Sequence, residues 1–183
     1  MACNVTRGRA INCKDVQGGI SAIYITDFGG LGTITESSDQ ISDMSGSFTA
    51  FKYDVNGAGN SFTTTATSSK DTGTAFFSTT LSLTLPKLSK EDNAELKLLA
   101  FGRPHIVAAD RNGNAFLIGK VNGCSLTTAT MVSGDARGDM SGYTMEFVAD
   151  EASAPDFING ATTGNPFAGM SSATVTVTAG TNS

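Results

Sequence analysis

The sequence contains no tryptophan, three tyrosines and a single histidine, His105, among 183 residues. Sugar-binding modules stack their ligands on exposed aromatic rings, so this scarcity argues against a carbohydrate-binding surface. Acyl-transfer catalysis needs a nucleophile, a base and an orienting acid, and no Gly-x-Ser-x-Gly motif accompanies His105. We therefore expect His105 to be a structural residue and the chain not to be an enzyme.

Basic residues are also few, 12 against 17 acidic ones, which gives a net charge of −5. No cluster of Lys or Arg interleaves with aromatic residues, and this disfavours tight nucleic-acid binding. No apolar run reaches membrane-spanning length, and the first residues lack the apolar centre of a signal peptide. We expect no membrane insertion and a chain made and kept in the cytosol, where mild acidity by itself favours solubility.

The three cysteines, Cys3, Cys13 and Cys124, include no Cys-x-x-Cys pair. An odd number of cysteines without an export signal predicts free thiols and no structural disulfide. Together with His105 they have the residue types of a Cys3His zinc site, but their spacing favours burial as small apolar side chains. The segment Gly29 to Thr33 has neither the Lys nor the helix of a phosphate-binding loop. We expect no cofactor and no metal.

Glycine, serine and threonine are abundant, and apolar residues alternate with polar ones along much of the chain. This pattern predicts a mainly β fold, an antiparallel sandwich or partial barrel with one flanking helix, in a single domain over 1–183. The expected strands are 19–26, 31–35, 47–53, 61–67, 75–85, 104–110, 114–121, 125–131, 141–149 and 173–178.

The clearest stretch runs from Pro104 to Glu151 and predicts a β-meander. Asn112-Gly113 lies between two alternating apolar runs, and Asn-Gly is a strong hairpin signal because both central residues need a positive φ. Asn122-Gly123 repeats the signal. Asp110 to Asn114 begins like a calcium loop, but Ala115 replaces its turn glycine, so we interpret it as a hairpin turn. Arg137-Gly138-Asp139 is interpreted as a turn rather than an integrin motif.

One short amphipathic helix is predicted over 90–101. Ser89 is placed to accept a backbone N–H at its start, and Gly102 suits a left-handed C-terminal cap. The apolar residues Ala94, Leu98 and Phe101 fall at helical spacing and define the expected buried stripe.

The block from Gly119 to Glu151 resembles the closing block of the tail tube proteins of long-tailed bacteriophages. That block has a Ser-Gly-x-x-x-Gly-Asp turn followed by a Gly-Tyr-x-x-x-Phe strand. The matching positions here are Ser133, Gly134, Gly138, Asp139, Gly142, Tyr143 and Phe147. The preceding Leu85-Pro86 strand end, capped helix and strand leading to Asn-Gly follow the family's order, so the likeness covers 81–151.

The resemblance implies a virion structural protein of the tail, assembled in the host cytoplasm, whose rings stack into a tube that conducts DNA during ejection without binding it specifically. In the resembling family the rings are hexameric, and six copies of this chain would carry a net charge of about −30. Implied partners are further copies of the chain and sheath, tape measure, baseplate and terminator proteins. Related tubes occur in type VI secretion and contractile injection systems.

We expect an N-terminal arm over 1–18, a C-terminal arm over 152–183 and a protruding hairpin over 37–74 whose turn is Asn56 to Gly59. An isolated hairpin of this kind leaves open edges, which suits a protein that polymerises. As a hypothesis, it contacts the next ring through Phe48, Phe51, Tyr53 and Phe62. The alternative is a flap packed on its own subunit.

Two other functions stay open. One is another ring-forming tail component, such as a terminator, and the other is a virion-surface β-sandwich that binds a ligand. The segment Thr174 to Val177 is compatible with an exchanged strand or an exposed tail.

Overall fold

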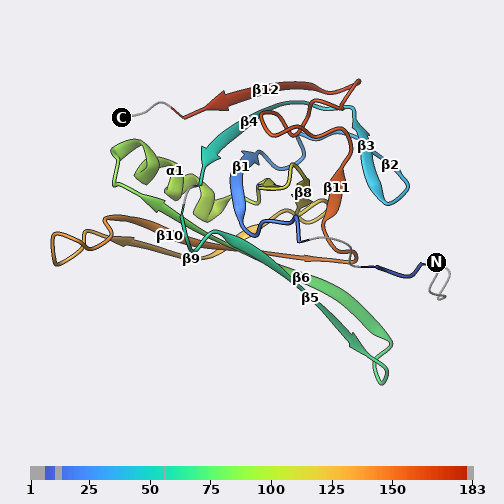
Figure 1. Ribbon diagram of the computed structural model, residues 1–183, viewed down its shortest axis with the longest axis horizontal. Helices are drawn as coiled ribbons and strands as arrows, with labels where there is room; N and C mark the ends of the chain where they lie inside the picture. The colour runs from blue at the N-terminus through green and yellow to red at the C-terminus, as the bar shows by residue number, and fades with distance from the viewer. Residues whose placement is uncertain (1–6, 11–13, 56, 181–183) are drawn as a thin grey trace.

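Twelve strands and one helix make up the described part of the chain, residues 7–10, 14–55 and 57–180 of a computed structural model (Figure 1). The predicted mainly β fold with one flanking helix is confirmed. In chain order the elements are β1 (Ile20–Thr26), β2 (Ile34–Ser37), β3 (Gln40–Met44), β4 (Ser47–Asp54), β5 (Ser61–Ser69), β6 (Thr74–Pro86), α1 (Lys90–Phe101), β7 (His105–Asp110), β8 (Ala115–Ile118), β9 (Ser125–Val132), β10 (Gly142–Glu151), β11 (Asp156–Ile158) and β12 (Thr174–Ala179).

The strands form two sheets. The large sheet has the order β12-β4-β1-β7-β8-β11-β3-β2, and the small sheet has the order β5-β6-β10-β9. The small sheet is antiparallel throughout, whereas the large sheet contains two parallel pairs, β12 with β4 and β11 with β3. The sandwich is therefore mixed in one layer and antiparallel in the other.

The main core lies between the two sheets. Alternation along β1 sends Ile23 and Ile25 into this core, where they join Leu81 and Phe147 of the small sheet. Tyr24 points to the opposite side of the large sheet, into a second core that is covered by the segment from Ile158 to Ala173. Strand side chains alternate between faces, so β1 supplies both cores. The central strands of the large sheet, β1, β7 and β8, are buried on both faces.

The small sheet is covered on one face only. Strands β6 and β10 pair along ten residues, from Gly142 opposite Pro86 to Glu151 opposite Phe77. The β5–β6 and β9–β10 hairpins then run beyond the core and project toward opposite ends of the molecule, to the lower right and to the left in Figure 1. The face turned away from the large sheet carries no layer of its own.

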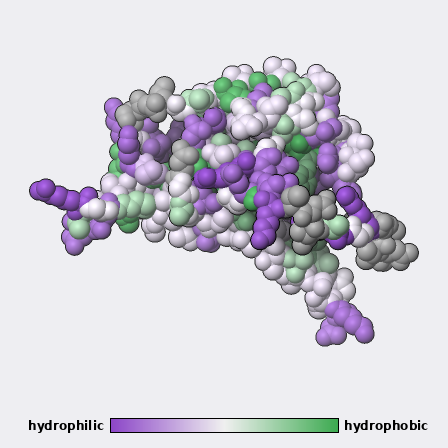
Figure 2. Space-filling view, viewed as in Figure 1, coloured by the Kyte–Doolittle hydropathy of each residue, from purple (hydrophilic) through white to green (hydrophobic). Residues whose placement is uncertain are grey.

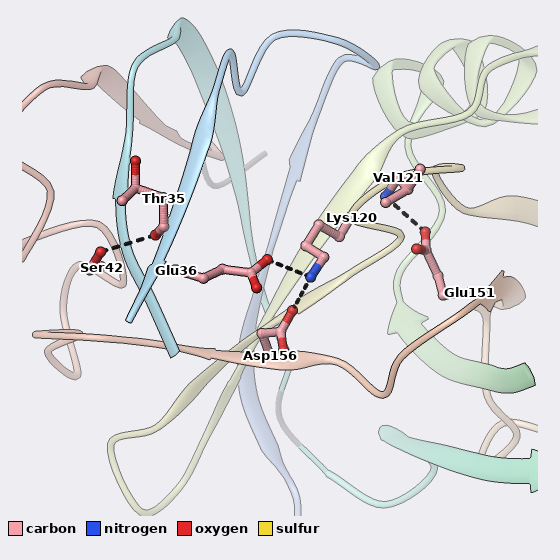
Figure 3. A network of polar contacts seen from close by, with 7 residues as sticks. All are labelled: Thr35, Glu36, Ser42, Lys120, Val121, Glu151 and Asp156. Carbon is pink, nitrogen blue, oxygen red and sulfur yellow. Dashed lines mark hydrogen bonds and ion pairs between the residues drawn. The ribbon is translucent and has the colours of Figure 1, made fainter. Parts of the chain in front are cut away.

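The predicted meander over 104–151 is wrong in its pairing. Strands β7 and β8 form a hairpin in the large sheet, whereas β9 and β10 form a hairpin in the small sheet. The chain changes sheets at Gly119 to Cys124. Here Glu151 Oε1 accepts a hydrogen bond from the backbone N–H of Val121 at 2.9 Å (Figure 3) and another from that of Asn122 at the same distance. The Asn-Gly signal predicted a turn correctly but does not specify which strand lies opposite.

A second polar contact in Figure 3 secures the far edge of the large sheet. Lys120 Nζ lies 2.7 Å from Glu36 Oε1 on β2 and 2.5 Å from Asp156 Oδ2 on β11. Partial burial lowers the pKa of Lys120, but the hydrogen bonds to Asp156 and Glu36 outweigh it and leave the pKa above its ordinary value. The ammonium thus joins the sheet-switching turn to two strands of the large sheet.

The predicted hairpin over 37–74 is also wrong. Its two long strands, β4 and β5, belong to different sheets: β4 pairs with β1 and β12, and β5 pairs with β6. The Asn56 to Gly59 turn passes from one layer to the other, and Asn56 itself lies outside the described residues. The projecting hairpin is instead β5–β6, which begins and ends later in the chain.

The helix prediction is confirmed over Lys90 to Phe101, and the Ser89 side chain accepts the N–H of Asp92 at 3.0 Å. Two details are wrong. Gly102 is extended, with φ −85° and ψ 171°, rather than left-handed. The stripe that packs against the main core is Leu96 and Leu99, both partly buried, whereas Ala94, Leu98 and Phe101 are exposed. At 12 residues, this helix of the described chain is too short and polar to span a membrane.

The expected terminal arms have different outcomes. Residues 7–10 and 14–18, within the expected N-terminal arm, are exposed and lack regular structure, and the rest of that arm lies outside the described residues. The expected C-terminal arm is wrong for its described part, because 156–158 and 174–179 are strands of the large sheet. Strands β3 and β11 were not predicted; both are short and lack a sustained alternating pattern.

Candidate functional site

The outward face of the small sheet is rich in hydroxyl groups. Alternation and pairing register place fourteen Ser and Thr side chains on it: Ser61, Thr63, Thr65, Thr67 and Ser69 on β5, Thr74, Ser78, Thr80, Ser82 and Thr84 on β6, Thr144 on β10, and Ser125, Thr128 and Thr130 on β9. Phe76, Val148, Glu146 and Asp150 share the face. The four strands lie wholly within the described residues and contain no Lys or Arg. The face is therefore neutral to acidic.

Both edges of the small sheet are open and uncharged. Strand β5 has nine residues and β9 has eight, and neither contains a charged side chain. An edge strand without Lys, Pro or a covering element is a template for pairing with another chain. A bulge interrupts β9 at Thr127, whose hydroxyl donates to the carbonyl oxygen of Glu146 at 3.1 Å, so only 128–132 form a regular edge.

The two edges of the large sheet differ from each other. Strand β2 is four residues long, has a register shift and carries Glu36 in the Lys120 contact, so it is protected against pairing. Strand β12 is uncharged and pairs with β4 without a shift. Its two valines contact the second core.

The two projecting hairpins of the small sheet become hydrophilic at their tips (Figure 2). In Figure 2 the β5–β6 hairpin is white to pale green along its length and purple at its tip, and the β9–β10 projection ends in purple. The charged residues at these tips are Lys70 and Asp71 on one hairpin, and Asp135, Arg137 and Asp139 on the other. Charge on the β5–β6 hairpin is thus confined to its end, whereas the β9–β10 hairpin also carries Glu146, Asp150 and Glu151 along β10.

The four aromatic residues proposed as ring-to-ring contacts are not brought together. Phe48 is buried in the second core, against Phe167 at 5.5 Å between ring centroids. Phe51 is exposed, and Tyr53 packs against the main core, where burial and then nearby acidic charge raise the pKa of its hydroxyl to about 12. Phe62 lies on β5, and its ring centroid is 5.1 Å from that of Phe116. Only Phe62 lies on the projecting hairpin.

The residues of the family-like motif have structural roles in the β9–β10 hairpin. Gly134 has a positive φ of 74°, and Asp139 Oδ2 accepts the N–H groups of Asp135 and Ala136 at 3.1 and 2.8 Å. A side chain on Gly142 would collide with the carbonyl oxygen of Leu85. Nothing in the surrounding structure requires glycine at Gly138.

Tyr143 and Phe147 from the same motif lie inside the molecule. The Tyr143 hydroxyl donates to the carbonyl oxygen of Ser89 at 2.9 Å and so joins β10 to the start of α1. Phe147 is fully buried between the sheets. Tyr143 and Phe147 thus anchor β10 to the rest of the fold. The outward face is formed by other residues, mainly the outward-facing Ser and Thr side chains of the four strands.

His105 is a satisfied structural histidine, as predicted. Its Nε2 accepts the N–H of Gly29 at 3.0 Å, so its Nδ1 carries the proton and donates to the carbonyl oxygen of Gly119 at 2.6 Å. The ring stacks on Phe28, which also lies under the Arg103 guanidinium. Both ring nitrogens are engaged, and neither is directed at a cleft.

Cys124 is buried in the main core, which confirms its interpretation as a small apolar side chain. Burial, with a smaller contribution from the charge of Glu151, raises the pKa of its thiol to about 12. Cys3 and Cys13 lie outside the described residues. Within the described part of the chain, no three His, Cys, Asp or Glu side chains are grouped to hold a metal ion.

The two loop motifs are turns, as predicted. Asp110 Oδ1 accepts the backbone N–H groups of Asn112 and Asn114, each at 2.8 Å, and Asn112 also bonds both backbone groups of Gln17. These bonds engage the Asp110 carboxylate and the Asn112 side-chain amide in the turn itself. Arg137 to Asp139 forms part of the exposed turn between β9 and β10.

No family model and no curated protein matches the chain. A search of solved structures found a chain of the "Virion of native gene transfer agent (GTA) particle" at 11% sequence identity and a TM-score of 0.34. The alignment covers 55% of this chain and 85% of that chain. A likeness this distant carries no argument about function.

Proposed function

We propose that the chain is a virion structural protein, a tail tube subunit that forms closed rings through its small sheet. Strand β9 of one copy pairs with β5 of the next, the rings stack head to tail, and the outward face becomes the wall of a lumen that conducts DNA. The observation that carries this proposal is a four-stranded sheet with one bare face and two open, uncharged edges.

Strand directions are compatible with closure. Neighbouring strands alternate in direction across β5-β6-β10-β9, so β5 and β9 run in opposite directions. Rotation about a ring axis preserves each strand's direction along that axis. Consequently β9 of one copy would meet β5 of the next as an antiparallel pair, and the sheet would continue from copy to copy without a mismatch.

The stagger of the sheet gives a geometric test of closure. The centre of β5, Thr65, is level with Asp150 of β10, whereas the centre of β9 is level with Met145 and Glu146. This offset of four to five residues displaces the edges of one copy by about 15 Å along the strands. The four strands of the copy span about 19 Å perpendicular to the strands. The repeat then tilts the strands by roughly 40° from the ring axis, within the range of closed barrels.

The bare face suits a conduit for DNA. A wall with Lys or Arg would hold phosphates and slow their passage, whereas hydroxyl groups with Glu146 and Asp150 offer no cation to bind them. Each copy contributes the same face, so the acidic groups repeat around the ring and keep the duplex from the wall. The subunit makes and breaks no covalent bond.

The projecting β5–β6 hairpin replaces the mispredicted one as the element that reaches the adjacent ring. Phe76 is exposed on it, and Ala66 and Ala75 near its tip are exposed as well. Stacking through this hairpin is a head-to-tail contact that does not close, so it generates a filament. Sheath, tape measure, baseplate and terminator proteins remain the proposed partners, in the tail of a virion assembled in the host cytoplasm.

Negative-stain electron microscopy of the purified chain tests the proposal, with mass photometry to count copies in a ring. Stacked rings or tubules are the expected result. Single rings that never stack would favour a terminator-like component, because the same open edges serve both. A protein that stays monomeric at high concentration would contradict the proposal and favour a ligand-binding sandwich.

A further inference from the structure

We infer the register of the junction between two copies: Phe62 of one copy lies opposite Met131 of its neighbour, with Thr63 opposite Thr130, Thr64 opposite Ala129 and Thr65 opposite Thr128. This inference rests on the proposed function, since it requires the β5–β9 pairing. It goes further by naming the contacts that set the junction.

The first constraint is that each side chain must stay on its own face. On β5, Phe62 and Thr64 face the main core and Thr63 and Thr65 face outward, as their partners Leu81, Thr79, Thr80 and Ser78 show. On β9, Ala129 and Met131 are opposite the inward residues Met145 and Tyr143. A one-residue slip would reverse every side chain, so only alternate registers are allowed.

The second constraint is the bulge. Thr127 interrupts the regular pairing of β9, and residues from Ser125 to Leu126 follow a shifted register. The regular edge of β9 is therefore Thr128 to Val132. The segment 61–65 of β5 has the same length. Pairing these two segments also centres the two edges on each other to within one residue, so it gives the largest overlap that the faces allow.

The side chains support this register. Met131 is 58% exposed although it lies on the core-facing side of the sheet, so the isolated chain leaves it without a cover. Phe62 is half-buried on the same side of the other edge, with one side of its ring against Phe116. Directly opposed residues have Cβ atoms about 5 Å apart, and a thioether packs well against an aromatic ring edge. On the outward face, threonine meets threonine.

Cysteine cross-linking tests the register in a Cys3→Ser, Cys13→Ser background. The pair Thr63→Cys and Thr130→Cys replaces two exposed threonines and should form disulfide-linked ladders of chains on non-reducing gels. Within one chain the two positions are separated by three strand spacings and about four residues along the strands, too far for a disulfide. The bond must therefore join two copies.

The matched control is Thr63→Cys with Thr128→Cys, which stays on the same face but is two residues out of register and should give several-fold less cross-linking. Ser61→Cys with Val132→Cys is a second pair in the inferred register and guards against one variant failing to assemble. Microscopy of each variant under reducing conditions reports assembly separately. Rings in which the control pair cross-links better would overturn the register alone, whereas the absence of any rings would overturn the proposed function with it.

Discussion

The two sheets of this protein differ in how completely they are covered. The central strands of the large sheet are buried on both faces, on one by the small sheet and on the other by the segment from Ile158 to Ala173, and its β2 edge is protected. The small sheet is packed on one face, and both of its edges are open. Within the described residues the large sheet thus leaves only its β12 edge open, whereas the small sheet leaves both of its edges for a second copy to complete.

The largest expected effect comes from a charge in the proposed junction. Ala129 is exposed in the isolated chain but would be covered when β5 of a neighbour pairs with β9. An unpaired lysine there costs on the order of several kcal/mol at every junction, so Ala129→Lys should abolish rings while circular dichroism stays unchanged.

Thr176→Lys on β12 is the matched control, because it charges the open edge of the large sheet. Electron microscopy should show normal assembly of this variant. If Thr176→Lys blocks rings and Ala129→Lys does not, the copies associate through the large sheet, and the roles of the two layers must be exchanged.

Strand β10 carries side chains on both the packed face and the bare face of the small sheet. Phe147 is fully buried between the sheets, whereas Thr144 on the same strand is exposed on the outward face. Phe147→Ala should lower the free energy of unfolding by about 3–5 kcal/mol, and Thr144→Ala should change it by less than about 1 kcal/mol. Urea denaturation checks both values, and equal losses would mean that the outward face is packed in solution.

Local signals predicted elements well and their partners poorly. The alternation in β1, β6 and β10 and the capped helix gave the correct element types, because these patterns depend on nearby residues. Asn56 to Gly59 and Asn122-Gly123 both predicted turns, yet each turn carries the chain from one sheet to the other. A turn signal describes the backbone at the turn, while the opposing strand is chosen by contacts distant in sequence.

The candidate surface could be predicted only in part. The Thr-rich, charge-free runs of β5 and β9 are visible in the sequence, but open edges were expected only for the hairpin over 37–74. Which strands lie at the edges depends on the order β5-β6-β10-β9, a non-local property. The contacts assigned to Phe48 and Tyr53 failed because an aromatic residue in an alternating run has the same pattern whether it faces a core or a partner.

The helix offers a smaller contrast between a packed and an open side. Leu96 packs against the main core, and Leu98, which the sequence favoured as buried, is 66% exposed. Leu96→Ala should cost about 1–3 kcal/mol of stability, and Leu98→Ala should stay within about 0.5 kcal/mol. Thermal unfolding of the unassembled chain measures both losses of stability. A larger loss for Leu98→Ala than for Leu96→Ala would mean that Leu98 is on the buried side of the helix, as the sequence predicted.

The smallest expected effects come from replacing two aspartates, Asp43 in the large sheet and Asp139 in a turn of the small sheet. Each carboxylate accepts several hydrogen bonds. Asp43 on β3 accepts bonds from Ser171 and Ser172, 128 and 129 residues away, and these bonds, that of the Ser172 hydroxyl first, hold the pKa of its carboxyl well below the ordinary value. Asp139 in the β9–β10 turn has a lowered pKa from the N–H groups of Ala136 and Asp135, only three and four residues away.

A carboxyl whose pKa is depressed by folding stabilises the fold above its unfolded pKa of about 4, and this contribution is lost as the pH falls through the lower folded value. The Tm difference between the parent chain and Asp43→Asn should therefore be largest near pH 7 and shrink toward pH 2. Asp139→Asn should show the same sign and a smaller difference, because its bonds close a local turn that is ordered with little chain entropy. A larger effect at Asp139 would mean that the hairpin tip, rather than the C-terminal cover of the large sheet, holds the fold together.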